Sequence, residues 1–282
     1  MKRFLISSIS VIVLVSSLFA AGSKELQTTE NDKTLRIVSL APNVTETVAA
    51  LGAENLLVGR TDYCNYPESV KDIPSIGTLW NPSIETIIAL KPDIVIASSL
   101  IDGAILSSLE KAGINVASLN KQQTFDGTYD FIREIGDLIG KEQEAETVVV
   151  SIKASVEKTR KSVEPLSSPT VYLAVSFGAM DSTATGDTFI GGMLALAGGK
   201  NVAGNATGWL FSKEELVQAD PDVLILMREE GKTDEETIQD WKTTSPYKTL
   251  RGKVSVIDAD LVSRQGPRSA EALSALAEII HR

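Results

Sequence analysis

The chain has 282 residues, of which 43% are hydrophobic and 23% charged, a balance typical of a soluble globular protein with one large or two small domains. Its formal net charge of −10 argues against nucleic acid or an anionic membrane surface as a partner. The single cysteine, Cys64, excludes an internal disulfide, and the single histidine, His281, lies too near the C-terminus to suit a histidine-based catalytic triad.

The N-terminus has the organisation of a secretory signal peptide. Two basic residues precede an apolar run at 4–19, and small residues follow it up to Gly22. The run is short for a membrane anchor, so we expect cleavage after Gly22 and a flexible polar leader at 23–33. Residues 1–22 hold two basic and no acidic residues, which makes the mature net charge −12. No cysteine follows the run, and the sequence therefore predicts a periplasmic protein that is not a lipoprotein.

The first part of the chain alternates short apolar runs with helical patterns. Strands are expected at 35–40, 56–59, 93–98 and 114–119, and helices at 43–51, 83–90, 104–112 and 125–139. Asn43 is expected to cap the first of these helices. Because the connections between strands and helices are short, the sheet is predicted to be parallel.

The longest helical pattern lies near the middle of the chain, at 141–165. No Gly or Pro interrupts it before Pro165, acidic residues crowd its start and basic residues its end, as the helix dipole favours. One apolar stripe is formed by Ala145, Val148, Val149, Ile152, Val156 and Val163. Roughly 22 residues would span about 33 Å. We predict a connecting helix between two lobes, although an ordinary amphipathic helix of one domain has the same pattern.

After Pro165 the alternation resumes. Strands are expected at 171–176, 222–227 and 254–258, and helices at 188–197, 234–241 and 268–281. The chain is therefore predicted to be an α/β protein with an N-terminal lobe at 34–140, a connecting helix at 141–165 and a C-terminal lobe at 166–282.

Residues 80–97 and 209–226 form an internal repeat at a constant offset of 129 residues. Its identities include the pairs Trp80 and Trp209, Ser83 and Ser212, Glu85 and Glu214, Pro92 and Pro221, and Asp93 and Asp222. Chance convergence on a helix–turn–strand unit is the alternative. Each serine is a candidate helix cap, with Ser212 and Glu215 forming a capping box. An acid near a helix start is often only solvated, but a matched pair, one per lobe, suits docking onto a basic, two-fold symmetric partner.

Four motifs resemble the periplasmic binding proteins of ABC importers for corrinoids and iron chelates, which include vitamin B12-binding and ferric-siderophore-binding proteins. The motifs lie at 39–46, 63–67, 87–97 and 264–268, and the resemblance extends from Leu35 to His281. It implies two Rossmann-like lobes with mainly parallel sheets, joined by one long helix, with the ligand cleft between them. It also implies that Glu85 and Glu214 dock into arginine pockets of the membrane permease.

The ligand site is expected beyond the carboxyl ends of the strands, as in other open α/β sheets. Large flat ligands need aromatic walls and a few polar anchors. The candidates are Asn43, Tyr63, Tyr66, Trp80, Ser98, Phe177, Trp209, Arg264 and Arg268. Any of these aromatic residues can instead be part of the core, and either arginine can be a surface charge; Arg60 is a weaker candidate. No metal-binding cluster, Walker loop or G-x-S-x-G motif occurs in the sequence.

The expected function is capture of a metal chelate and its delivery to an ABC importer permease with its ATPase, by a monomer that has no catalytic activity and no cofactor of its own. A corrinoid leads over a ferric siderophore, with haem third. Few basic residues near the expected cleft favour a nearly neutral ligand, whereas the two arginines keep anionic siderophores open, and a tyrosine ligand to iron would indicate haem. The alternative of another class is an exported α/β enzyme with a cleft between its domains.

Overall fold

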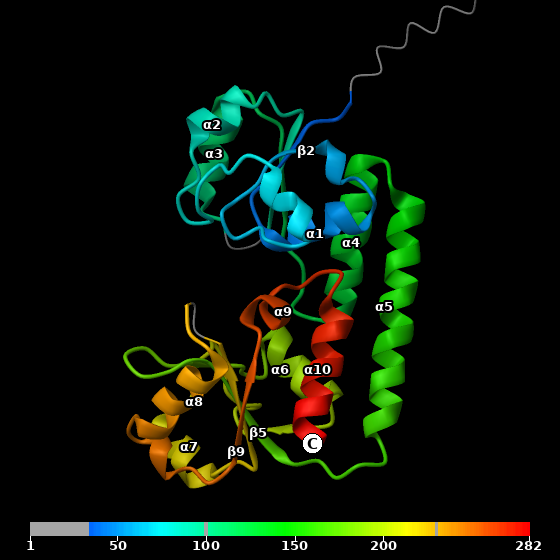
Figure 1. Ribbon diagram of the computed structural model, residues 1–282. Helices are drawn as coiled ribbons and strands as arrows, with labels where there is room; N and C mark the ends of the chain where they lie inside the picture. Colours follow the sequence, from blue (N-terminus) through cyan, green and yellow to red (C-terminus); the bar gives the residue numbers. More distant parts are fainter. Residues whose placement is uncertain (1–33, 99–100, 229–230) are drawn as a thin grey trace, which may run out of the picture. The chain divides into compact units, whose positions relative to one another are not determined.

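A computed structural model of the chain describes residues 34–98, 101–228 and 231–282 (Figure 1). The predicted signal peptide and leader lie outside these residues, as does the proposed cleavage site. Residues 34–282 pack as one compact unit. Within it, two sheets each carry their own helices, and we call the part around the first sheet the N-lobe and the part around the second sheet the C-lobe.

The N-lobe sheet has four parallel strands in the order β2-β1-β3-β4. The strands are β1 (Ile37–Ser39), β2 (Leu57–Gly59), β3 (Ile94–Ser98) and β4 (Val116–Leu119). The helices are α1 (Pro42–Ala50), α2 (Ile84–Ala89), α3 (Gly103–Lys111) and α4 (Phe125–Ile139), with short 3-10 turns η1 (Glu54–Leu56) and η2 (Glu68–Asp72). The central strand β3 is buried at all five residues, because helices cover both faces of the sheet.

The C-lobe sheet follows the order β6-β5-β8-β9, with β7 also paired to β5. Its strands are β5 (Thr170–Ser176), β6 (Ser182–Thr183), β7 (Lys200–Asn201), β8 (Val223–Met227) and β9 (Lys253–Ile257). Its helices are α6 (Phe189–Leu196), α7 (Lys213–Ala219), α8 (Asp234–Thr243), α9 (Ala259–Ser263) and α10 (Ser269–His281), with the 3-10 turn η3 (Tyr247–Thr249). Only the pairing of β6 with β5 is antiparallel among the described strands, so the predicted mainly parallel sheet is confirmed.

The predicted connecting helix is α5 (Glu142–Val163), which Figure 1 shows running past both sheets. Ala145, Val149 and Ile152 pack into an N-lobe core with α1 and α4, whereas Val163 packs into a C-lobe core with α6 and α10. Val156 contacts both cores. One helix face therefore contacts two hydrophobic cores.

Two local features differ from the sequence expectations. Asn43 does not cap α1: the cap position is Ala41, with Pro42 first in the helix, and the Asn43 side-chain oxygen accepts a bond from the Val44 amide instead. Proline suits the first helical position because it has no amide hydrogen to satisfy there. The short strands β6 and β7 and the helix α9 were not expected, because two to five residues are too few to show a period.

Candidate functional site

The loop that follows β2 presents two tyrosines at the surface. Tyr63 and Tyr66 are 41% and 47% exposed, whereas Cys64 between them is 1% exposed and lies 3.2 Å from the Thr61 hydroxyl. Arg60 fixes the base of the loop by donating to the carbonyls of Val70 and Lys71, at 2.8 and 2.9 Å, and to that of Thr61. Arg60 therefore stabilises the loop backbone. The exposed rings of Tyr63 and Tyr66 are available to a flat ligand.

The two candidate anchors Arg264 and Arg268 lie on the segment between α9 and α10, and both bind the Glu46 carboxylate in α1. Arg264 donates to Glu46 at 2.7 Å, and Arg268 forms a two-pronged contact at 2.8 and 2.9 Å. Burial by itself lowers the pKa of Arg268. The hydrogen bonds and the charge of Glu46 raise that pKa by more than burial lowers it, so the net shift is upward and the guanidinium stays charged. Only 7% of the Arg264 side chain is exposed, which leaves little of it for a ligand to contact.

Glu46 is a residue that the sequence reasoning missed as part of the site. It is 3% exposed in a helix whose neighbouring residues Val44 and Val48 are fully buried. A glutamate at an apolar position of a predicted helix signals a buried partner, because an unpaired buried carboxylate is costly. Glu46 is the last residue of the sequence motif at 39–46, so its unusual position could have been noticed from the sequence. Its partners, Arg264 and Arg268, could not be identified in this way, because they lie 218 and 222 residues away.

The two repeat tryptophans are both at the surface, with Trp80 65% and Trp209 39% exposed. Trp209 has a backbone φ of +66°, a conformation that is strained for an aromatic residue. Three contacts hold this turn: the Trp209 amide donates to the Thr185 hydroxyl at 3.1 Å, the Thr183 amide donates to the Trp209 carbonyl at 2.9 Å, and the Gly208 amide donates to Asp187 at 3.0 Å. The backbone from which the indole projects is thus held in place.

The remaining candidates have different surroundings. Ser98 lies at the carboxyl end of β3, as expected, but is only 8% exposed. Phe177 is half-buried and packs edge-on against Trp241 and Tyr247, with ring centroids 5.1 and 5.9 Å away. Asn43 donates to the Gln265 carbonyl at 3.3 Å. The structure therefore brings together one group, composed of Asn43, Tyr63, Tyr66, Arg264 and Arg268. Among the described residues, no hydrogen bond, ion pair or ring contact joins Trp80, Ser98, Phe177 or Trp209 to this group.

The candidate docking residues Glu85 and Glu214 are exposed and occupy the second position of α2 and α7. Both helices begin at a serine whose hydroxyl accepts from the amide of the third helical residue, at 3.1 Å in each case. The capping box of Ser212 and Glu215 is confirmed. Neither Glu85 nor Glu214 makes an ion pair with another described residue, although the Ser83 hydroxyl donates to the Glu85 carboxylate at 3.4 Å.

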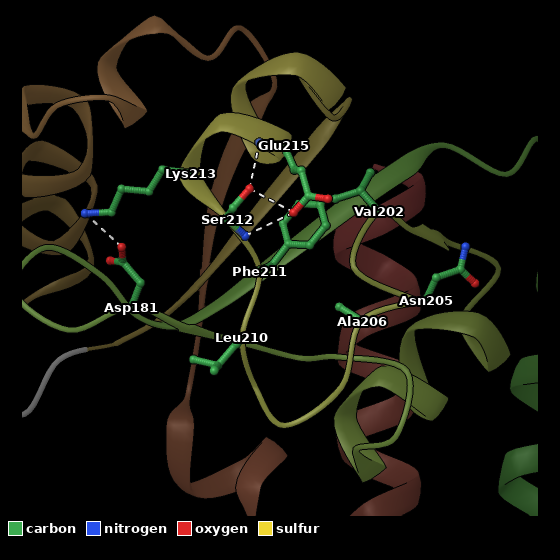
Figure 2. A pocket seen from close by; sticks show the side chains of 9 residues that line it. All are labelled: Asp181, Val202, Asn205, Ala206, Leu210, Phe211, Ser212, Lys213 and Glu215. Carbon is green, nitrogen blue, oxygen red and sulfur yellow. Dashed lines mark hydrogen bonds and ion pairs between the residues drawn. The ribbon is translucent and has the colours of Figure 1, made fainter.

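A hollow of about 580 Å³ is lined by Asp181 and by residues of the segments 202–206 and 210–215, among them Glu215 (Figure 2). Asp181 closes one side through an ion pair with Lys213 at 2.8 Å and a hydrogen bond from the Tyr247 hydroxyl. Burial raises the pKa of Asp181, but the bonds from Lys213, Tyr247 and the Gly178 amide together lower it below its usual value. None of the predicted ligand residues lines this hollow.

The described residues were compared with the requirements of a metal site and of a membrane span. They contain no group of three or more His, Cys, Asp or Glu side chains that could hold a metal ion. His281 lies at the end of α10, with Nε2 2.9 Å from the Ala197 carbonyl oxygen. No helix within the described ranges has both the length and the apolar character needed to cross a membrane.

Comparison with known proteins gives consistent matches. A family model described as "Periplasmic binding protein" matches residues 37–261. The uncharacterized ABC transporter substrate-binding lipoprotein YvrC of Bacillus subtilis is 34% identical, over 87% of this chain and 80% of its own length. The cobalamin-binding protein of Halobacterium salinarum is 26% identical, over 87% of this chain and 69% of its own.

A solved structure gives the same result for the fold. The crystal structure of a possible iron-binding, periplasmic solute-binding protein from Staphylococcus epidermidis is 32% identical, with a TM-score of 0.76, and the match covers 88% of this chain and 98% of that one. The predicted two parallel-sheet lobes are therefore confirmed at the level of fold. Because YvrC is named a lipoprotein, the expectation that the present chain is not one finds no support among these relatives.

Proposed function

The chain belongs to the periplasmic binding protein family, and from this membership we propose that it captures a metal chelate, with a corrinoid favoured, and delivers it to an ABC importer. It is a substrate-binding protein of the ABC importer type and not an enzyme. The alternative of an exported α/β enzyme is thereby set aside. We propose the identity of the chelate, the residues that dock onto the permease, and an ATPase as the partner of that permease.

The observation that carries the ligand class is the charge balance around Arg264 and Arg268. These two guanidinium groups face the carboxylates of Glu46 and Asp260, at 2.7 to 2.9 Å. Two positive and two negative charges cancel, so the group offers no surplus of positive charge to a highly anionic siderophore. A nearly neutral corrinoid suits this setting better.

The exposed aromatic side chains support a large flat ligand. Tyr63, Tyr66, Trp80 and Trp209 present their rings at the surface, and such rings give contact area and stacking at small entropic cost. The name of the Halobacterium relative, a cobalamin-binding protein, points to the same ligand class. The Staphylococcus structure is named as possibly iron-binding, which keeps a ferric chelate as the second candidate, and haem follows it.

A spectroscopic titration tests this proposal. Purified protein lacking residues 1–22 is mixed separately with cyanocobalamin, haemin, ferric citrate and a ferric catecholate, while tryptophan fluorescence and the visible spectrum are followed. We expect cyanocobalamin to quench fluorescence at micromolar concentration or below. Trp80→Ala with Trp209→Ala removes two of the three tryptophans, so the Kd of this variant is read from the visible spectrum, and we expect it to rise. Tight binding of the catecholate, with no response to cyanocobalamin, would replace the corrinoid by a siderophore. No binding of any of the four would contradict the chelate proposal.

For delivery, we propose that Glu85 and Glu214 contact basic residues of the permease. Their exposure, their equivalent helix positions and the absence of an ion-pair partner among the described residues support this role. Both carboxylates lie in the first turn of their helices. We further propose a periplasmic monomer in which the single helix α5 limits the movement of the lobes, because one stiff connection allows a smaller hinge than flexible strands do.

A further inference from the structure

Glu46 links α1 of the N-lobe to the segment 260–268 of the C-lobe. Its carboxylate accepts one hydrogen bond from Arg264 and two from Arg268, while only 3% of the residue is exposed. Burying a carboxylate is unfavourable unless charged donors replace its water. The two guanidinium groups satisfy that requirement here, and Glu46 is the one carboxylate among the described residues that contacts both of them.

The same two arginines hold the tyrosine loop of the N-lobe. Arg264 donates to the Tyr63 carbonyl at 3.0 Å and to the Asn65 side-chain oxygen at 2.8 Å. The Arg268 guanidinium carbon lies 4.1 Å from the centre of the Tyr66 ring, a cation–π contact. A chain of direct contacts therefore runs from Glu46 through both arginines to the two tyrosines.

Asp260 completes the arrangement on the C-lobe side. It accepts from Arg264 and from the Asn65 amide, each at 2.7 Å. The loop is thus bound through a backbone carbonyl, an amide side chain and an aromatic ring. With Arg268 over the ring, 47% of Tyr66 is still exposed, so part of it remains open to a ligand.

We propose that Glu46 is a positioning residue for the ligand wall formed by Tyr63 and Tyr66. It acts through Arg264 and Arg268, which fix the loop from the opposite lobe and present the tyrosines to a flat chelate. The arginines then shape the wall, and their charge is neutralised before a ligand arrives. The inference rests on the proposed function, because the wall is taken to face the bound chelate.

A role confined to stability is the rival explanation, and it predicts a different pattern. If Glu46 only joined the lobes, its loss would lower the melting temperature and increase hydrogen exchange in both lobes. If it positions the loop, its loss changes the loop locally and weakens ligand binding through Tyr66. Two measurements separate the two explanations. The first is hydrogen exchange without ligand, which shows whether the change is confined to the loop, and the second is ligand affinity with and without the Tyr66 ring.

The test compares wild-type protein with Glu46→Gln, which keeps the volume and removes the charge. Without ligand, we expect hydrogen–deuterium exchange of the amides at 61–66 to rise by roughly fivefold or more. The strands β5 and β8 of the C-lobe should be unchanged. The matched control is Glu146→Gln, which removes the surface carboxylate that Arg133 contacts at 2.8 Å, and it should leave exchange at 61–66 unaltered.

Ligand titration then completes a double-mutant cycle with Tyr66→Ala. We expect Glu46→Gln to raise the Kd for the best chelate by roughly fivefold or more in the wild-type background, and to change it by less than about twofold when Tyr66 is already alanine. Arg268→Lys supplies a second variant in case Glu46→Gln does not fold. It keeps a positive charge near Glu46 but loses the flat guanidinium over Tyr66. Its effect on the Kd should likewise be large when Tyr66 is present and small when Tyr66 is alanine.

Unchanged exchange at 61–66 in the folded variants would overturn the positioning role, and so would an equal rise in both lobes. An equal loss of affinity with and without the Tyr66 ring would also overturn it. If no chelate binds wild-type protein, the proposed function fails, whereas the exchange experiment still decides whether Glu46 positions the loop.

Discussion

Lys91 and Asp220 share an unusual backbone conformation at the same place in the two copies of the repeat. Their φ angles are +47° and +38°, and each residue lies in the turn that leads from the repeat helix into the next strand. Two residues further on, Asp93 accepts from the Arg36 amide at 3.0 Å and Asp222 accepts from the Thr170 amide at 2.8 Å. Related turns with the same cross-strand contact favour a true repeat over chance convergence.

This relationship makes the paired glutamates the first target for mutagenesis. We expect Glu85→Lys combined with Glu214→Lys to abolish uptake in cells while the Kd for ligand stays within about twofold of wild type. Each reversal alone should reduce uptake partially, because one contact of the pair remains. Glu110→Lys with Glu235→Lys, two exposed helical acids outside the repeat, is the control with the same change in charge. Normal uptake by the Glu85 and Glu214 double variant would contradict the docking proposal.

The connecting helix should respond to substitution according to its two faces. Ile152 is 4% exposed in the N-lobe core, whereas Val150 two residues away is 56% exposed. We expect Ile152→Ala to lower the free energy of unfolding by about 2–4 kcal/mol. Val150→Ala should change it by less than about 0.5 kcal/mol. Chemical denaturation measures both, and equal effects would show that the helix is not held by its buried stripe.

The conformation of Trp209 predicts a difference between two small replacements. At a φ of +66°, glycine is unstrained and alanine is not. We expect Trp209→Gly to be more stable than Trp209→Ala by roughly 1 kcal/mol, although glycine normally destabilises a chain relative to alanine. Thermal melts of the two variants give the comparison. A more stable alanine variant would mean that this turn relaxes when the indole is removed.

Asp181 should contribute to stability in a pH-dependent manner. Because its pKa is lowered in the folded protein, its contribution is complete above the pKa of an unfolded aspartate, about 4, and is lost as the pH falls through the folded value. We expect Asp181→Asn to lower the melting temperature at pH 6 by roughly 2–4 °C, with a smaller difference at pH 2.5. Exposed Asp137, changed to Asn, is the control. A constant difference over this range would exclude the ionised carboxylate as its source.

Much of the architecture followed from local sequence patterns. The stripe from Ala145 to Val163 determined α5, because a 3.6-residue period places its apolar side chains on one face whatever they pack against. The predicted capping box at Ser212 and Glu215 depends on contacts within four residues, and it formed as expected. Buried parallel strands such as β3 and β8 were recognisable as short continuous apolar runs.

The site depended on contacts that no local pattern contains. Arg264 and Arg268 were recognisable as charged residues, but a charge alone does not reveal its partner, and Glu46 lies more than 200 residues away in the chain. Only the packing of the segment 260–268 against α1 and the tyrosine loop decided that these arginines face carboxylates and a ring. The sequence by itself therefore determined the longer elements, the repeat and the family resemblance, because these depend on side-chain order and spacing. The tertiary structure decided which charges are neutralised and which aromatic rings stay exposed, because burial and long-range pairing exist only once the chain is packed.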